Sequence, residues 1–98
     1  MSAVLKTAEA RFEALIESAL DVVMPIELTS YEFPWTRGNF SDSLRAGYQA
    51  QLLMAGQEVL GYFVAMKGVD EVHLLNLTVI PEYRSQGWAR LMLDGLDL

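Results

Sequence analysis

The stretch that decides the fold is residues 75–90 of this 98-residue chain, which read LNLTVIPEYRSQGWAR. Its first six residues are mostly apolar and typical of a strand, which Pro81 ends because proline cannot donate to a strand ladder. Gly87 then opens an amphipathic helix. The side chains expected to be buried on this helix are Trp88, Leu91, Met92 and Leu96. The stretch therefore predicts a strand that delivers a loop to the start of a helix.

The start of this helix has the properties of an anion-binding site. The first four backbone N–H groups of a helix lack intrahelical partners, and the helix dipole adds about half a positive charge. Gly87 permits a positive φ angle and a close approach of the main chain, and Ala89 adds only a methyl group. Arg90 in the first turn is disfavoured by about 0.3–1 kcal/mol unless an anion lies nearby. The pattern Arg84-x-x-Gly87-x-Ala89 thus favours a bound phosphate, and the alternative is a strand–turn–helix that serves packing alone.

Two further strands are predicted upstream of the decisive stretch. Residues 48–55 and 59–67 are rich in apolar, β-branched and aromatic side chains and predict a hairpin around Gly56-Gln57. The decisive strand itself spans residues 71–80. Strict alternation would place four of its side chains on one face: His73, Leu75, Leu77 and Val79. Because both faces are largely apolar, we expect this strand to be central in its sheet.

The first half of the chain is predicted to be helical. Thr36 is the expected N-cap of a helix that runs through Phe40 and Leu44 and ends at Gly47. By propensity, residues 7–20 would form another helix. A further helical pattern follows Asp21 and breaks near Pro34.

Composition restricts the chain to one domain with a modest core. The sequence is 52% hydrophobic with a net charge of −6, which excludes a disordered tail. Because it has no cysteine and one histidine, disulfides, thiol catalysis and a metal cluster are excluded, and we expect no metal. No apolar stretch is long enough to cross a bilayer, and the acidic first third disfavours nucleic acid. We expect a cytoplasmic protein that binds neither membranes nor nucleic acid.

Together the motifs resemble the GNAT superfamily of N-acetyltransferases, whose acetyl-coenzyme A signature is Gln/Arg-x-x-Gly-x-Gly/Ala between a strand and a helix. The likeness extends to residues 31–36 (YEFPWT), 39–40, 61–62, 70–71 and 74–77, which are similar to the ribosomal-protein alanine N-acetyltransferases of RimI type. It covers about residues 12–98, which match the front part of a GNAT domain.

The resemblance implies an α/β (α+β) fold of the acyl-CoA N-acyltransferase kind. The implied element order is β-α-α-β-β-β-α with a mainly antiparallel sheet, and it lacks the C-terminal strands and helix of the family. Residues 1–98 would form a single partial GNAT domain that binds acetyl-coenzyme A. The family topology also replaces the helix over 7–20 with a strand near 12–17 and a helix over about 21–31. Pro25 would then lie in the early turns of that helix, where few backbone donors are needed.

The resemblance also assigns roles to individual residues. The backbone of Leu77, Thr78 and Val79 would pair with the pantetheine arm of acetyl-coenzyme A. The diphosphate loop would consist of Arg84, Ser85, Gln86, Gly87, Trp88, Ala89 and Arg90. The loop Phe33, Pro34 and Trp35 would help to form the channel for a peptide N-terminus, or would instead cap the core with aromatic rings.

The implied reaction is direct transfer of acetyl from acetyl-coenzyme A to a protein N-terminal α-amino group, such as the alanine of a ribosomal protein. The enzyme needs a base for the amine and an acid for the leaving thiolate. In the family the catalytic Glu and Tyr lie beyond the first coenzyme helix, which is past Leu98. His73 is a candidate base, and packing or a surface hydrogen bond is the alternative role for it.

The sequence is therefore compatible with three functions. The first is an N-acetyltransferase of RimI type that is incomplete as a 98-residue chain. The second is a non-catalytic coenzyme A-binding or regulatory remnant, and the third is a small α/β interaction module without a nucleotide. Strand 71–80 would lack the later strand that flanks it in the family. We therefore expect that the chain is poorly soluble, forms a homodimer through this uncovered edge or represents an incomplete reading frame.

Overall fold

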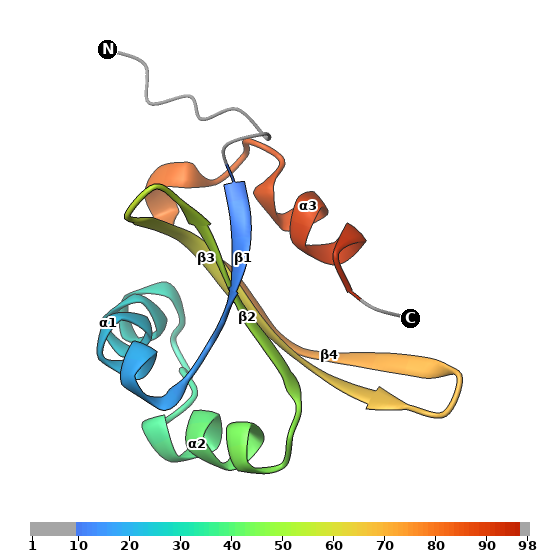
Figure 1. Cartoon of the computed structure of the whole chain (residues 1–98). Helices are drawn as coiled ribbons and strands as arrows, with labels where there is room; N and C mark the ends of the chain where they lie inside the picture. The colour runs from blue at the N-terminus through green and yellow to red at the C-terminus, as the bar shows by residue number, and fades with distance from the viewer. Residues whose placement is uncertain (1–9, 97–98) are drawn as a thin grey trace.

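One antiparallel sheet with helices on both faces makes up the part of the chain, residues 10–96, that the computed structural model describes (Figure 1). The elements are β1 (Ala10–Ala14), α1 (Leu20–Ser30), α2 (Arg37–Arg45), β2 (Gln49–Ala55), β3 (Glu58–Gly68), β4 (Glu71–Val79) and α3 (Trp88–Asp94). Short 3-10 turns, Glu17–Ala19 and Pro81–Tyr83, precede α1 and α3. The strands lie in the order β1-β2-β3-β4, and all neighbours are antiparallel. The predicted order β-α-α-β-β-β-α and the α+β fold are confirmed.

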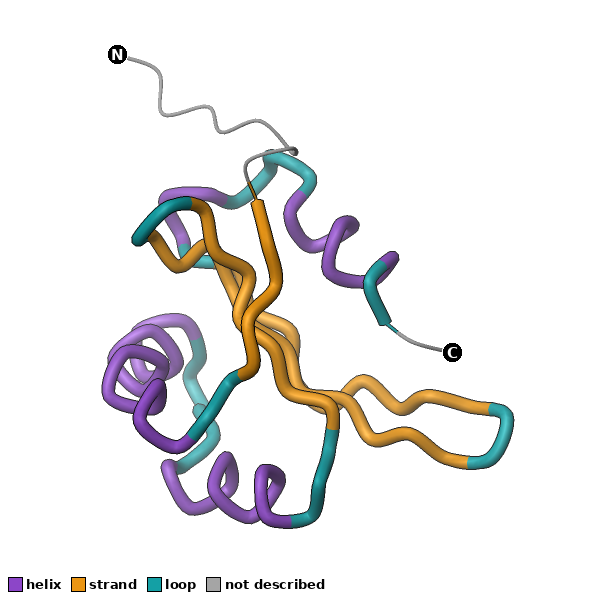
Figure 2. Tube along the Cα trace, in the orientation of Figure 1, coloured by secondary structure: helices purple, strands orange, loops and turns teal. Residues whose placement is uncertain are grey.

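The core consists of two apolar clusters, one on each face of the sheet. Figure 2 shows α1 and α2 on one side of the strands and α3 on the other. The first cluster joins the helices α1 and α2 to β2 and β3 through Leu20, Val23, Phe40, Leu52, Tyr62 and Val64. The second joins α3 to the opposite face through Leu53, Leu60, Phe63, Trp88 and Met92. Neighbours such as Leu52 and Leu53 serve different clusters because successive strand residues point to opposite faces.

The start of the chain follows the family topology and not local propensity. Phe12 lies in a strand and pairs with Leu53 of β2, so the helix that propensity predicts over residues 7–20 is wrong for residues 10–14. Strand pairing overrides the modest helix preference of Ala and Glu there. Residues 7–9 of that prediction lie outside the described residues. Pro25 is the sixth residue of α1, which is deeper in the helix than expected.

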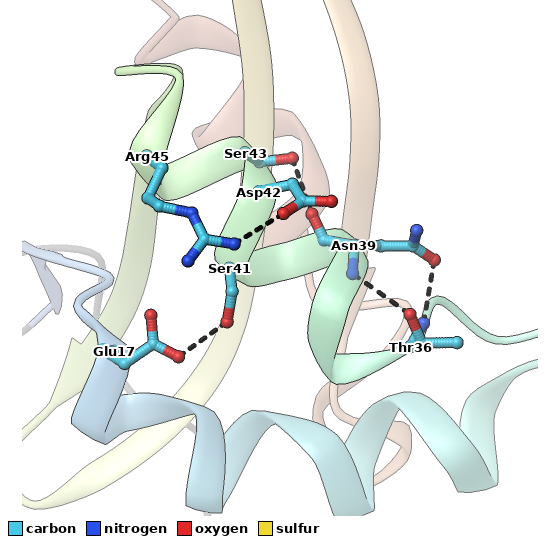
Figure 3. Close-up of polar contacts among 7 residues, drawn as sticks. All are labelled: Glu17, Thr36, Asn39, Ser41, Asp42, Ser43 and Arg45. Carbon is cyan, nitrogen blue, oxygen red and sulfur yellow. Dashed lines mark hydrogen bonds and ion pairs between the residues drawn. The ribbon is translucent and has the colours of Figure 1, made fainter.

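The N-terminus of α2 is fixed by the predicted cap. The Thr36 hydroxyl accepts a hydrogen bond from the Asn39 N–H at 3.1 Å, and Asn39 Oδ1 accepts one from the Thr36 N–H at 3.0 Å (Figure 3). Ser41 donates to Glu17 at 2.6 Å and so ties α2 to the turn before α1. This reciprocal cap anchors the end of the aromatic loop, residues 33–35, that lies directly before it.

β4 lies at the edge of the described sheet, so the expectation of a central strand is wrong for these residues. Its register against β3 also contains a bulge: Val64 pairs with Asn76 and Ala65 with Leu74, which leaves Leu75 as the extra residue. A single extra residue reverses the alternation of side chains beyond it. His73 therefore faces the opposite side of the sheet from Leu77, and the predicted shared face is wrong.

Candidate functional site

A cavity of about 420 Å³ lies where β4 ends and α3 begins. The residues that line it are Ser30, Tyr31, Leu77, Val79, Tyr83, Arg84, Ser85, Gly87, Trp88 and Ala89. The structure thus brings together most of the residues predicted to bind acetyl-coenzyme A. Thr78, Gln86 and Arg90 do not line this cavity.

The loop before α3 leaves its backbone donors open. Ser85 (φ +64°) and Gly87 (φ +89°) are both in the left-handed region, a conformation in which successive N–H groups can converge on an anion. A Cβ atom added at Gly87 would meet nothing within 4 Å, so no side chain blocks the bend. Within residues 10–96, no hydrogen bond is found for the N–H groups of residues 85–90. The loop is therefore open and has unpaired donors, as an anion site requires.

The side chains of the loop hold its shape. Arg84 Nε donates to the carbonyl oxygen of Val79 at 3.0 Å and so ties the loop to the end of β4. Trp88 Nε1 donates to Gln86 Oε1 at 3.3 Å. Arg90 is exposed and lies 3.9 Å from Asp94, one turn further along α3. Its predicted contact with a diphosphate remains a prediction.

The outer edge of β4 presents free main-chain groups to the same cavity. The Ile80 N–H donates to Leu60 of β3 at 2.9 Å, so residues 78 and 76 also turn their backbone groups toward β3. Leu77 and Val79 must then face outward. Their carbonyl oxygens accept hydrogen bonds from Tyr31 Oη and Arg84 Nε, and within the described residues their N–H groups have no partner. An extended ligand can pair with these N–H groups.

A second cavity of about 260 Å³ lies beside the bulge of β4. It is lined by Glu27, Tyr31, Phe33, Trp35, Leu75, Asn76 and Leu77, and it shares Tyr31 and Leu77 with the first cavity. The aromatic residues of the predicted peptide-channel loop have different environments. Phe33 is 86% exposed, whereas the ring centroid of Trp35 lies 4.9 Å from that of Phe40. Trp35 therefore caps the core and also lines the cavity; Pro34 lies between the two residues and does not line it.

A buried carboxylate that sequence reasoning missed lies at the wall of the second cavity. Glu27 is 1% exposed and accepts from Tyr62 Oη at 2.7 Å, from the Trp35 N–H at 2.9 Å and from Asn76 Nδ2 at 3.2 and 3.3 Å. Burial and the hydrogen bond to Glu27 raise the pKa of the Tyr62 hydroxyl far above its ordinary value. The available signal was the polar pair Asn76 and Thr78 in the otherwise apolar run of residues 74–80, since buried polar groups require partners.

His73 lies outside both cavities. Its Nε2 is 3.0 Å from Glu71 Oε2, and both side chains are about half exposed near the β3–β4 turn. The bulge at Leu75 separates it from the residues around Leu77. The arrangement fits the alternative role as a surface hydrogen bonder and gives no geometric support to a catalytic base at this position.

The structure also bears on membranes and metals. No helix in the described range 10–96 is both long and apolar enough to span a membrane. In the same part of the chain, His, Asp and Glu side chains form no group of three that could hold a metal ion.

The fold is similar to the folds of solved N-acetyltransferases. The ribosomal-protein-S18-alanine N-acetyltransferase of Escherichia coli matches with a TM-score of 0.78 and 24% identity, over 88% of this chain and 56% of that one. Arabidopsis thaliana Naa50, solved in complex with the bisubstrate analogue CoA-Ac-MVNAL, matches with a TM-score of 0.71 and 15% identity, over 88% and 60%. The described chain has the GNAT fold.

The sequence is also similar to curated proteins that share one name. The [ribosomal protein bS18]-alanine N-acetyltransferase of Haemophilus ducreyi is 25% identical over 84 residues, which are 86% of this chain and 58% of the relative. The enzyme of the same name from Haemophilus influenzae is 25% identical over 96 residues, 98% of this chain and 60% of the relative. No protein-family model matches the sequence. The chain is thus similar to these N-acetyltransferases at about 25% identity, and it spans about 60% of the length of these two relatives.

Proposed function

We propose that this chain carries the acetyl-coenzyme A site of an N-acetyltransferase. The supporting observation is one cavity that is lined by two sets of residues with unpaired backbone donors. The first set is Ser85, Gly87, Trp88 and Ala89, and the second is Leu77 and Val79. The first set suits a diphosphate, because N–H groups at such a bend converge on an anion. The second set suits an extended arm that pairs with a strand edge. Coenzyme A combines a diphosphate and an amide-bearing arm in one molecule.

The proposed acceptor is the α-amino group of a protein N-terminus, such as the alanine of a ribosomal protein. The cavity beside Phe33 and Trp35 meets the first cavity at Leu77, so an amine there would lie next to a thioester held along β4. The names of the relatives, which refer to ribosomal protein bS18, support this substrate class and a cytoplasmic location. Nucleic acids and membranes have no part in the proposal.

The residues of the two cavities supply binding and orientation. Acetyl transfer requires a neutral amine, and an α-amino group titrates near about 7.7–8.0, so a base has to take its proton. Among the residues that line the cavities, Glu27 carries the one carboxylate, and its two oxygens already accept four hydrogen bonds. This observation favours, as a second candidate, a chain that binds coenzyme A and has no catalysis of its own.

Isothermal titration calorimetry with acetyl-coenzyme A tests the site through two matched glycines. Gly87 (φ +89°) and Gly47 (φ +79°) are both open to an added Cβ atom, so alanine at either position costs a similar strain of about 1–2 kcal/mol. Gly87 lines the cavity and Gly47 does not. We expect Gly87→Ala to weaken the binding of acetyl-coenzyme A about tenfold or more. Gly47→Ala should leave this affinity unchanged. Equal affinities in all three proteins, or no binding at high micromolar ligand, would refute the site.

An assay of thiol release separates the two candidate functions. The full 98-residue chain is mixed with acetyl-coenzyme A and a peptide that begins with alanine, and the free thiol of coenzyme A is measured. Peptide-dependent release supports an acetyltransferase active in this chain. Binding of acetyl-coenzyme A without release supports the non-catalytic coenzyme A-binding chain.

We also propose that two copies of the chain associate through the open edge of β4. Leu74 and Leu75 are 43% and 38% exposed on this strand, and an unpaired apolar edge attracts another strand. Sedimentation equilibrium should find dimers that Leu74→Lys dissociates. Val22→Lys, which changes a half-exposed residue of α1, should not alter the dimer. A monomeric wild-type chain at the same concentration contradicts the proposal.

A further inference from the structure

A chain of hydrogen bonds runs from the surface at Tyr31 to the buried carboxylate of Glu27. Tyr31 Oη lies 2.8 Å from Thr78 Oγ1, which lies 2.8 Å from Asn76 Oδ1, and the amide nitrogen of Asn76 reaches Glu27. Tyr31 is 40% exposed, whereas Thr78 and Glu27 are each 1% exposed. The chain thus connects a solvent-accessible hydroxyl to a group inside the core.

The carboxylate fixes the direction of every donor in this chain. Glu27 is surrounded by donors from Tyr62, Trp35 and Asn76, which is the environment of an ionised carboxylate, since a protonated acid would need an acceptor for its own proton. Asn76 must therefore turn its NH₂ group toward Glu27 and its oxygen toward Thr78. The single proton of Thr78 then goes to that oxygen.

The hydroxyl group of Tyr31 can only donate its proton to the protein groups around it. Because the Thr78 hydroxyl has used its proton, it can only accept from Tyr31, and the other nearby group, the carbonyl oxygen of Leu77 at 3.1 Å, is also an acceptor. The proton of Tyr31 therefore points toward β4 in either case. The hydroxyl oxygen therefore has a lone pair that can accept a hydrogen bond from a ligand. Tyr31 lies where the two cavities meet.

We propose that Tyr31 is a substrate-positioning residue whose hydroxyl oxygen accepts a hydrogen bond from the α-amino group of the acceptor peptide. The inference rests on the proposed function and adds a recognition element for a free amino terminus. Glu27 supports the same preference, because its buried negative charge is met by neutral donors and lies at the wall of the second cavity. A positively charged or N–H-rich group is favoured there over a neutral one.

The test compares two peptides of the same size on the full chain saturated with coenzyme A. One begins with alanine and has a free amino group; in the other, propionic acid replaces that alanine, so that a hydrogen atom that cannot donate a hydrogen bond replaces the amine. We expect wild type to prefer the amine by about tenfold or more, the range for hydrogen bonds to charged groups. Tyr31→Phe should reduce this preference to less than about twofold and leave the affinity for the propionic acid peptide unchanged. A purely structural loss would weaken both peptides equally.

Tyr48→Phe is the matched control, because Tyr48 is a partly buried tyrosine packed on the first core cluster and lines neither cavity. It should keep the wild-type preference. A preference unchanged in Tyr31→Phe, or absent in wild type, overturns the proposal. The proposal is also overturned if Tyr31→Phe weakens only the binding of coenzyme A, because the Tyr31 lone pair would then accept from the pantetheine amide. A chain that binds no coenzyme A refutes the proposed function instead, and the same peptides titrated without it still decide the role of Tyr31.

Discussion

Glu27 joins four parts of the chain through one buried side chain. It lies on α1, and it binds the backbone of the aromatic loop at Trp35, the hydroxyl of Tyr62 on β3 and the amide of Asn76 on β4. The donors on Tyr62 and Asn76 are buried and the Trp35 N–H is part-buried. Bulk water therefore cannot take the place of the carboxylate as their acceptor without a rearrangement. The carboxylate therefore sets the position of the loop beside the second cavity as well as adding stability.

Removal of this carboxylate should destabilise the fold strongly. Glu27→Ala leaves three buried or part-buried donors unpaired, at about 1–3 kcal/mol each, so we expect the free energy of unfolding to fall by about 3 kcal/mol or more. Glu27→Gln keeps one acceptor oxygen and should cost less. Urea denaturation measures both, with Glu17→Ala as an exposed control that loses one hydrogen bond to Ser41. A Glu27→Ala protein within 1 kcal/mol of wild type, roughly the loss of a single net hydrogen bond, would contradict the role assigned to Glu27.

Tyr62 should make the fold sensitive to alkaline pH. Its pKa is raised in the folded state, first by burial and next by Glu27, above the value near 10 that it has in the unfolded chain. This contribution to stability is complete below pH 10 and is lost as the pH rises above it, because the unfolded state releases the proton and the folded state does not. Between about pH 10 and 11.5, wild type should lose more free energy of unfolding than Tyr62→Phe. Parallel pH profiles of the two proteins would refute the assignment.

At the scale of elements, much of the fold could be predicted from local signals. The apolar runs, Pro81 and Gly87 located β2, β3, β4 and α3 to within about two residues, and Thr36 located the start of α2. The bulge in β4 could not be predicted, because Leu74 and Leu75 are both apolar and strict alternation and a bulge look alike there. The Glu27 network was hidden because its partners on β3 and β4 are 35 and 49 residues away in sequence.

The outward-facing residues of β4 should be visible in hydrogen exchange. The amides of residues 76, 78 and 80 point toward β3, whereas those of Leu77 and Val79 point to the free edge. In the free chain at low concentration, we expect Leu77 and Val79 to exchange much faster than their neighbours, as measured by NMR. Uniform protection along residues 76–80 would contradict the register on which the site depends.

At the scale of the whole molecule, the two faces of the sheet carry different parts of the site. The face covered by α1 and α2 holds the buried network and the aromatic loop, while the face covered by α3 holds the loop with open N–H groups. Both cavities open at the same edge, where β4 has no neighbour in the described sheet. A ligand that runs along this edge can therefore contact both faces at Leu77.

The most direct test of the account is an NMR titration of the ¹⁵N-labelled chain with acetyl-coenzyme A. We predict that the largest changes in amide chemical shift fall on Leu77, Val79 and residues 84–90, and that hydrogen exchange at Leu77 and Val79 slows when the ligand binds. Residues 49–55 of β2, on the other side of β3, should change little. Changes centred elsewhere, or a saturating ligand that leaves residues 84–90 unaffected, would contradict the claim that these backbone groups bind the cofactor.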